Sequence, residues 1–220
     1  MSAAETNQPS EQVGLLKAEA GLHVDGYPNA KRVVKWDSKK TERLAVLRVH
    51  ESSLRFCQAA MQEFLKISPE LPIASYAALI GIVAKYFSCF GKNLANGPLS
   101  PDKVFKGMPE AKECFVYWKK IRDSHFIHEE GVLNERVTGI VLGENEEAVD
   151  VVNLSVTASV SDFEHQQLLY NLISHTLAHV IDDSEALRQS ILEDAGKLSA
   201  EDRKNLADLR IDIPSRERLP

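Results

Sequence analysis

The chain has few cysteines, no excess of positive charge and no Gly-rich phosphate-binding loop. Its three cysteines, Cys57, Cys89 and Cys114, are odd in number and follow no C-x-x-C spacing. This argues against a disulfide framework or a zinc ribbon and predicts reduced, buried thiols. The net charge of −6 over 220 residues argues against a broadly basic nucleic-acid-binding surface, although it leaves room for a small local cluster of cations.

Long apolar runs are also scarce. Residues 73–90 come nearest to a membrane span in length, but Ser75, Lys85 and Ser88 interrupt them. The sequence therefore predicts a buried core helix and no membrane partner. Residues 1–11 are polar and lack both the basic start and the apolar stretch of a signal peptide, which predicts a cytoplasmic protein.

The chain does show the periodicity of α-helices. Apolar residues recur at three- and four-residue spacings, which predicts a mainly α-helical fold. Helix starts are marked by Ser100-Pro101 and by a capping box at residues 161–164. The predicted helices cover residues 41–67, 73–91, 101–105, 109–128 and a long segment that begins at the capping box.

The period changes between residues 136 and 158. Apolar and polar residues alternate in part on either side of an acidic turn at 144–147, which predicts a β-hairpin. Because an isolated two-stranded hairpin is marginal, we expect it to lie on the helices or to pair with the apolar patch of Val33, Val34 and Trp36. The predicted fold is a helical bundle with an inserted or appended β-hairpin.

The predicted domain organisation has three parts. A partly disordered extension is expected at the N-terminus, a helical domain with the hairpin follows it, and a charged tail ends the chain. These parts cover residues 1–40, 41–197 and 198–220.

One short motif suggests chemistry. Arg122 is followed by the polar residue Asp123 and, after five intervening residues, by His128. A histidine titrates near neutral pH and can remove or supply a proton. An arginine is always charged and can bind a phosphate through two parallel hydrogen bonds. Such a pair suits cleavage of RNA, which carries its own nucleophile in the 2′-hydroxyl, without a metal ion.

A helical domain with this motif in a late helix resembles the HEPN superfamily, and in particular the relatives of abortive-infection proteins. The resemblance rests on Arg122, Asp123 and His128 and covers the helix order over roughly residues 41–195. It implies a metal-independent endoribonuclease that leaves a 2′,3′-cyclic phosphate, with these three residues as its catalytic site. The hairpin after the motif is not part of the common HEPN core.

The spacing of Arg122 and His128 constrains how they meet. On one straight α-helix they lie about 120° apart and about 9 Å along the axis. They line one cleft if the helix ends near His128, or if two copies face each other across a two-fold axis. HEPN relatives dimerise with their motifs together, so the resemblance implies a homodimer around residues 109–128. Three aromatic residues there suit a buried interface: Phe115, Tyr117 and Trp118.

A structural interpretation of the motif stands beside the catalytic one. Arg122 could be a surface ion-pair partner, and His128 could favour the dipole at a helix C-terminus. His125 and Glu129 match no standard zinc spacing and are interpreted as support for the motif.

A second histidine group lies later in the chain, at His165, His175 and His179. His175 and His179 share a helix face, but position 176 is threonine rather than the glutamate of a metalloprotease, so no metal site is predicted.

The sequence thus supports three hypotheses. The first is a ribonuclease or toxin of phage defence, with RNA as substrate, no cofactor and an antitoxin protein as a candidate partner. The second is a non-catalytic, dimeric helical interaction module. The third is a histidine-dependent metalloprotein built on a helix bundle.

Overall fold

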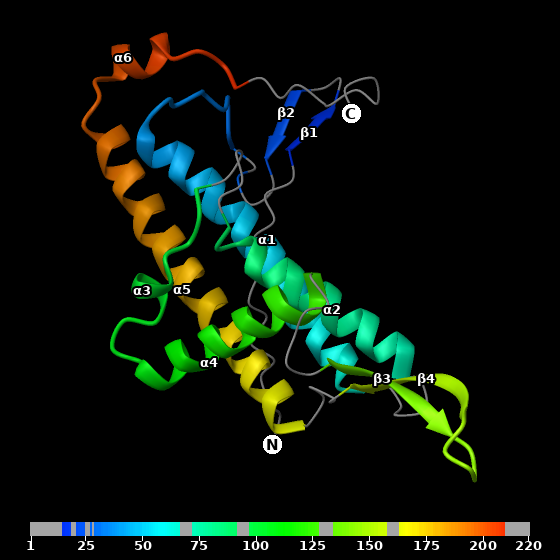
Figure 1. Ribbon diagram of the computed structural model, residues 1–220. Helices are drawn as coiled ribbons and strands as arrows, with labels where there is room; N and C mark the ends of the chain where they lie inside the picture. Colours follow the sequence, from blue (N-terminus) through cyan, green and yellow to red (C-terminus); the bar gives the residue numbers. More distant parts are fainter. Residues whose placement is uncertain are drawn as a thin grey trace, which may run out of the picture. The chain divides into compact units, whose positions relative to one another are not determined.

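The computed structural model describes residues 15–18, 21–24, 27, 29–66, 72–91, 97–127, 134–157 and 163–209. The chain divides into two compact units, one formed by residues 39–191 and the other by residues 1–38 and 192–220. The fold is mainly helical with a β-hairpin, so the predicted fold class is confirmed (Figure 1).

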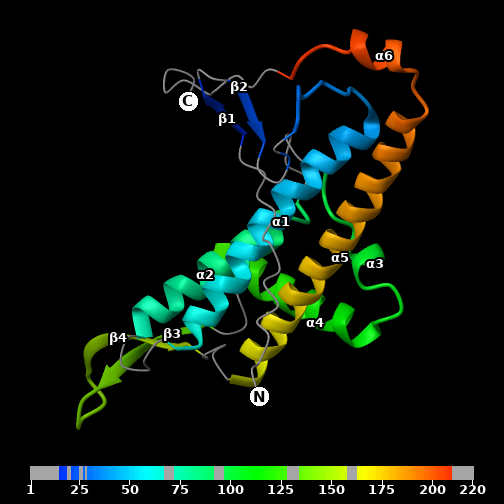
Figure 2. The ribbon, with the colours of Figure 1, turned by 180° about the vertical axis from the view of Figure 1, so that it is seen from behind.

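Helices α1 (Lys39–Phe64) and α2 (Pro72–Ser88) lie side by side (Figures 1 and 2). Both match predicted helices, and α2 coincides with the most apolar run of the sequence. Within the part of the chain that the structure describes, no helix has both the length and the hydropathy needed to span a membrane. The apolar spacing that predicted α1 corresponds to a buried face of this helix. The buried apolar residues on it are Leu47, Leu54, Cys57, Met61 and Phe64.

Helices α3 (Pro101–Val104) and α4 (Pro109–Ile121) are separated by a turn at Gly107, whose φ of +76° is a conformation that glycine adopts without strain. The long helix α5 (Phe163–Gly196) completes the bundle. The first two residues of the capping box predicted for it, 161 and 162, lie outside the described residues. Rings from α2, the turn after it, the turn after α3 and helix α4 form an aromatic cluster: Tyr86, Phe87, Phe90, Phe105 and Phe115.

The predicted hairpin is confirmed as the antiparallel strands β3 (Asn134–Leu142) and β4 (Ala148–Thr157). Its register shifts by one residue between Val141 and Leu142, next to the acidic turn. The expectation that it lies on the helices is wrong for its outer half, because apolar side chains such as Ile140 and Val151 are exposed there. The outer half projects away from the helices (Figures 1 and 2).

In the smaller unit, backbone pairing joins segments from both ends of the chain. Strands β1 (Leu15–Ala18) and β2 (Gly21–Val24) form an antiparallel pair. The apolar patch near Val34 pairs with residues close to Asp208, where the Lys35 amide donates to the Ala207 carbonyl at 2.7 Å. A short helix, α6 (Ala200–Asn205), begins at a capping box made by Ser199 and Asp202.

A buried hydrogen bond links α2 to α5. The hydroxyl oxygens of Tyr86 and Thr176 are 3.0 Å apart, and both side chains are fully buried. Because the Thr176 hydroxyl donates to the Leu172 carbonyl at 2.8 Å, the Tyr86 hydroxyl must be the donor in the first bond. Burial raises the pKa of Tyr86, which keeps that hydroxyl protonated.

We expect Tyr86→Phe to lower the free energy of unfolding by about 0.5–1.5 kcal/mol, the usual net value of one hydrogen bond. Urea unfolding followed by circular dichroism measures the change. Tyr76→Phe is the matched control, because Tyr76 is half exposed and its change should leave the unfolding midpoint in place. Equal effects of the two substitutions would contradict this assignment.

Candidate functional site

The helix type changes where the motif begins. The α-helical hydrogen bonding of α4 ends at Ile121, and the π-helix η1 (Arg122–Ile127) follows without a break. The prediction of one α-helix to residue 128 is therefore wrong over this segment, and the rotation of 120° calculated for an α-helix does not apply to it. Short π-helical turns are rare in proteins, and those that do occur are frequently found at functional sites.

The side chain of Arg122 is held in place from two sides. Its Nε donates to Oδ1 of Asp123 at 2.7 Å, and its Nη2 donates to the same oxygen. The guanidinium carbon lies 5.1 Å from the ring centroid of Phe87, a cation–π contact. The side chain is 21% exposed, so Arg122 is a fixed cation that solvent still reaches.

Asp123 also accepts a hydrogen bond from Lys119 Nζ at 2.8 Å. Burial alone would raise the pKa of Asp123, but the hydrogen bonds from Lys119 and Arg122 outweigh it and lower the pKa below its usual value. The carboxylate is therefore ionised at neutral pH and bridges two cations. This suits Asp123 to orienting Arg122 and not to transferring a proton.

The third residue of the predicted site, His128, lies outside the described residues, as do Glu129 and the side chain of His125. The described part of the site brings Arg122 and Asp123 together. It adds two residues that were not predicted from the sequence, Lys119 and Phe87. The four-residue spacing of Lys119 and Asp123 on one helix was a usable signal for the first. Nothing in the sequence pointed to Phe87, which comes from a different helix.

Two of the three aromatic residues beside the motif are not available for the predicted interface between two copies. Phe115 and Trp118 are buried in the core of the same chain, so they cannot contribute to a contact between copies. Tyr117 is partly exposed, and its ring centroid lies 5.1 Å from that of His165. Any interface around α4 must therefore use exposed residues of that helix, such as Val116.

Each member of the second histidine group contacts its own neighbour. His175 Nε2 lies 2.9 Å from the carbonyl oxygen of Val104, and His179 Nε2 lies 3.6 Å from a carboxylate oxygen of Asp183. Among the residues that the structure describes, no three histidine, cysteine or acidic side chains are placed to share a metal ion.

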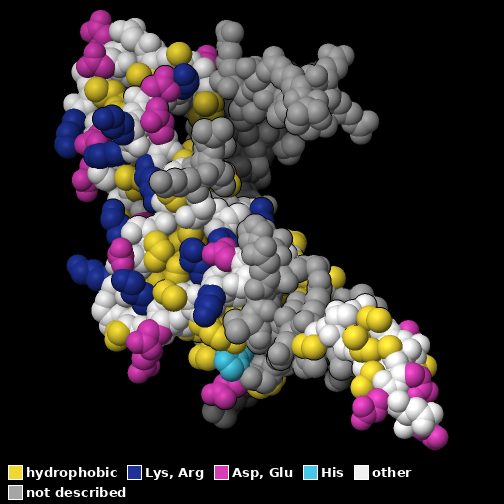
Figure 3. Space-filling view, in the orientation of Figure 1, with side chains coloured by type: hydrophobic (Ala, Val, Ile, Leu, Met, Phe, Trp, Pro, Cys, Tyr) yellow, Lys and Arg dark blue, Asp and Glu magenta, His cyan; other side chains and the backbone are white. Residues whose placement is uncertain are grey.

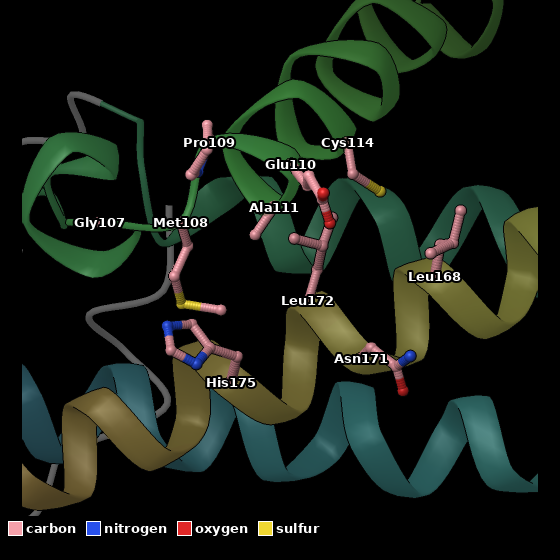
Figure 4. Close-up of a pocket in the computed structure, with 10 residues that line it drawn as sticks. All are labelled: Gly107, Met108, Pro109, Glu110, Ala111, Cys114, Leu168, Asn171, Leu172 and His175. Carbon is pink, nitrogen blue, oxygen red and sulfur yellow. The ribbon is translucent and has the colours of Figure 1, made fainter.

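A cavity of about 420 Å³ lies between the turn after α3, helix α4 and helix α5 (Figure 4). His175 and Cys114 line it, whereas Arg122 and Asp123 do not. Burial raises the pKa of Cys114, and it raises those of Cys57 and Cys89 to about 12 and about 11. The thiols therefore stay protonated at neutral pH, which does not favour nucleophilic catalysis by cysteine.

The sequence matches no protein-family model, no curated protein and no solved structure.

Proposed function

We propose that the chain is a metal-independent endoribonuclease of the HEPN type, in which Arg122 binds the scissile phosphate and His128 transfers the proton. The observation that carries this proposal is the fixed guanidinium of Arg122 at the start of η1. A preorganised cation stabilises the charge that develops on a phosphate in the transition state without having to be ordered first.

Arg122 retains N–H groups that can donate hydrogen bonds to a phosphate, although its guanidinium is paired with Asp123. A guanidinium carries five N–H groups, and the bonds from Nε and Nη2 to Asp123 use two of them. Within the described residues, Nη1 makes no hydrogen bond. The remaining donors on Nη1 and Nη2 lie in one plane at the end of the side chain, where they suit two oxygens of one phosphate.

The reaction then needs one base and no bound metal. His128 takes the proton of the 2′-hydroxyl, and the 2′ oxygen forms a bond to phosphorus. The bond from phosphorus to the 5′ oxygen breaks, and that oxygen takes a proton from water. The products are a 2′,3′-cyclic phosphate and a 5′-hydroxyl. A homodimer and a neutralising antitoxin protein belong to this proposal as its partners.

The test is cleavage of a structured RNA by purified protein with EDTA present. The purified protein is expected to cleave the RNA, and EDTA should not inhibit this cleavage. Cleavage only after addition of a divalent metal would contradict it and would favour the metalloprotein hypothesis.

The interaction-module hypothesis is supported by one observation. Because the Arg122 guanidinium is ion-paired with its neighbour Asp123, a purely structural motif would have the same geometry. On that hypothesis the protein cleaves no RNA under any metal condition, and substitution of Arg122 affects only stability.

A further inference from the structure

The outer half of the β3–β4 hairpin, called here the arm, carries apolar side chains that nothing described covers. Ile140 and Leu142 are two residues apart on β3 and share a face, and Val151 is the cross-strand partner of Ile140. Val149 is the extra residue at the register shift. These four side chains are between 58% and 65% exposed. Since a two-stranded hairpin is marginal in water, such a patch indicates a surface that binds another surface.

The arm is also strongly acidic. Its turn and the start of β4 carry Glu144, Glu146, Glu147 and Asp150, and residues 137–153 include no lysine or arginine. Figure 3 shows hydrophobic and acidic side chains together at the end of the arm. A surface that fits the arm should therefore be apolar and should carry positive charge at its edge.

Helices α1 and α2 form a groove with these properties, of about 810 Å³. One wall is Phe56, which is 60% exposed although it is a large aromatic residue. At Gly81 a Cβ would meet nothing within 4 Å, so the groove is open above this position. The apolar residues that line the groove are Phe56, Ala60, Phe64, Ala78, Gly81 and Ile82.

The charges beside the groove are complementary to those of the arm. Lys85 lines it and makes no ion pair within the described residues. The single acidic residue among the lining residues, Glu63, is already paired with Lys66 Nζ at 2.8 Å. A cation thus remains unpaired in the groove, whereas the arm offers an excess of carboxylates.

We propose that the arm of one copy docks in the α1–α2 groove of a second copy of this chain, and that the exchange is reciprocal. Arm and groove are both exposed in a single chain, so the arm does not fill its own groove. Reciprocal docking about a two-fold axis covers the arm and the groove of each copy and closes the assembly as a dimer. This interface uses no residue of α4 and does not depend on the ribonuclease proposal.

Sedimentation velocity over a range of protein concentrations tests the exchange. Wild type should be a dimer. Gly81→Leu places a large side chain in the groove, where its Cβ meets no atom within 4 Å, and should raise the dissociation constant on the order of tenfold or more. Ala84→Leu is the matched control, because it places the same leucine side chain at an exposed position of α2 outside the groove and should leave the dimer intact.

Charge reversal gives a second, independent test. Lys85→Glu should weaken the dimer, as should the pair Glu144→Lys and Glu146→Lys, and combining all three changes should restore it. A wild-type monomer, or dimers that tolerate Gly81→Leu, would overturn the proposal. A dimer lost through Val116→Glu on α4 but kept in Gly81→Leu would assign the contact to α4 and would equally overturn it.

Discussion

His128→Ala is expected to slow RNA cleavage by on the order of 10²-fold or more, because in the proposed mechanism His128 takes the 2′ proton. Arg122→Ala should cause a loss of similar size by removing the cation proposed to bind the phosphate. Arg122→Lys keeps the charge but not the planar donors, so it should recover only part of the rate. Single-turnover cleavage of a labelled RNA with EDTA present measures all three.

The comparison needs a control for folding, since Arg122 also has a structural role. Its guanidinium packs on Phe87 and binds Asp123, so Arg122→Ala removes contacts as well as charge. Urea unfolding therefore measures the stability of each variant and of wild type. Cleavage rates are compared at a temperature at which both are folded. If Arg122→Ala and His128→Ala cleave at the wild-type rate while folded, neither residue takes part in the chemistry.

Phe115→Ala is expected to have the largest effect on stability, lowering the free energy of unfolding by about 3–5 kcal/mol. Phe115 is buried, and its ring contacts the four others in the aromatic cluster at centroid distances of 4.7 to 6.4 Å. Truncation leaves a cavity that these large rings fill poorly. Equilibrium unfolding in urea measures the loss.

The neighbouring residue provides the control for this substitution. Val116 lies on the same helix but is 57% exposed, so Val116→Ala should change the free energy of unfolding by no more than about 0.5 kcal/mol. A loss below about 1 kcal/mol for Phe115→Ala would mean that the core collapses around the gap, contrary to the packing described.

The sequence was sufficient to predict most of the secondary structure. The apolar stripe of α1, the apolar character of α2 and the start of α4 at Pro109 all follow from local patterns of spacing and capping. The alternation around the acidic turn likewise identified the β3–β4 hairpin. These features are local, because each depends on residues within one or two turns of the chain.

The contacts between distant segments could not be predicted in the same way. Helical periodicity does not distinguish a π-helix from an α-helix, so the change at Arg122 left no signal. The contact between Arg122 and Phe87 depends on the packing of different helices. An aromatic residue in an amphipathic helix can face the core or a partner, and for Trp118 only the structure shows that it faces the core.

Analysis of the ends of the cleaved RNA tests the central claim most directly. Wild-type protein is incubated with a defined RNA in EDTA, and the new ends are identified by mass spectrometry, with His128→Ala treated in parallel. The proposed mechanism predicts 2′,3′-cyclic phosphate and 5′-hydroxyl ends from wild type and none above background from the variant. New 5′-phosphate ends, or equal cleavage by His128→Ala, would contradict it.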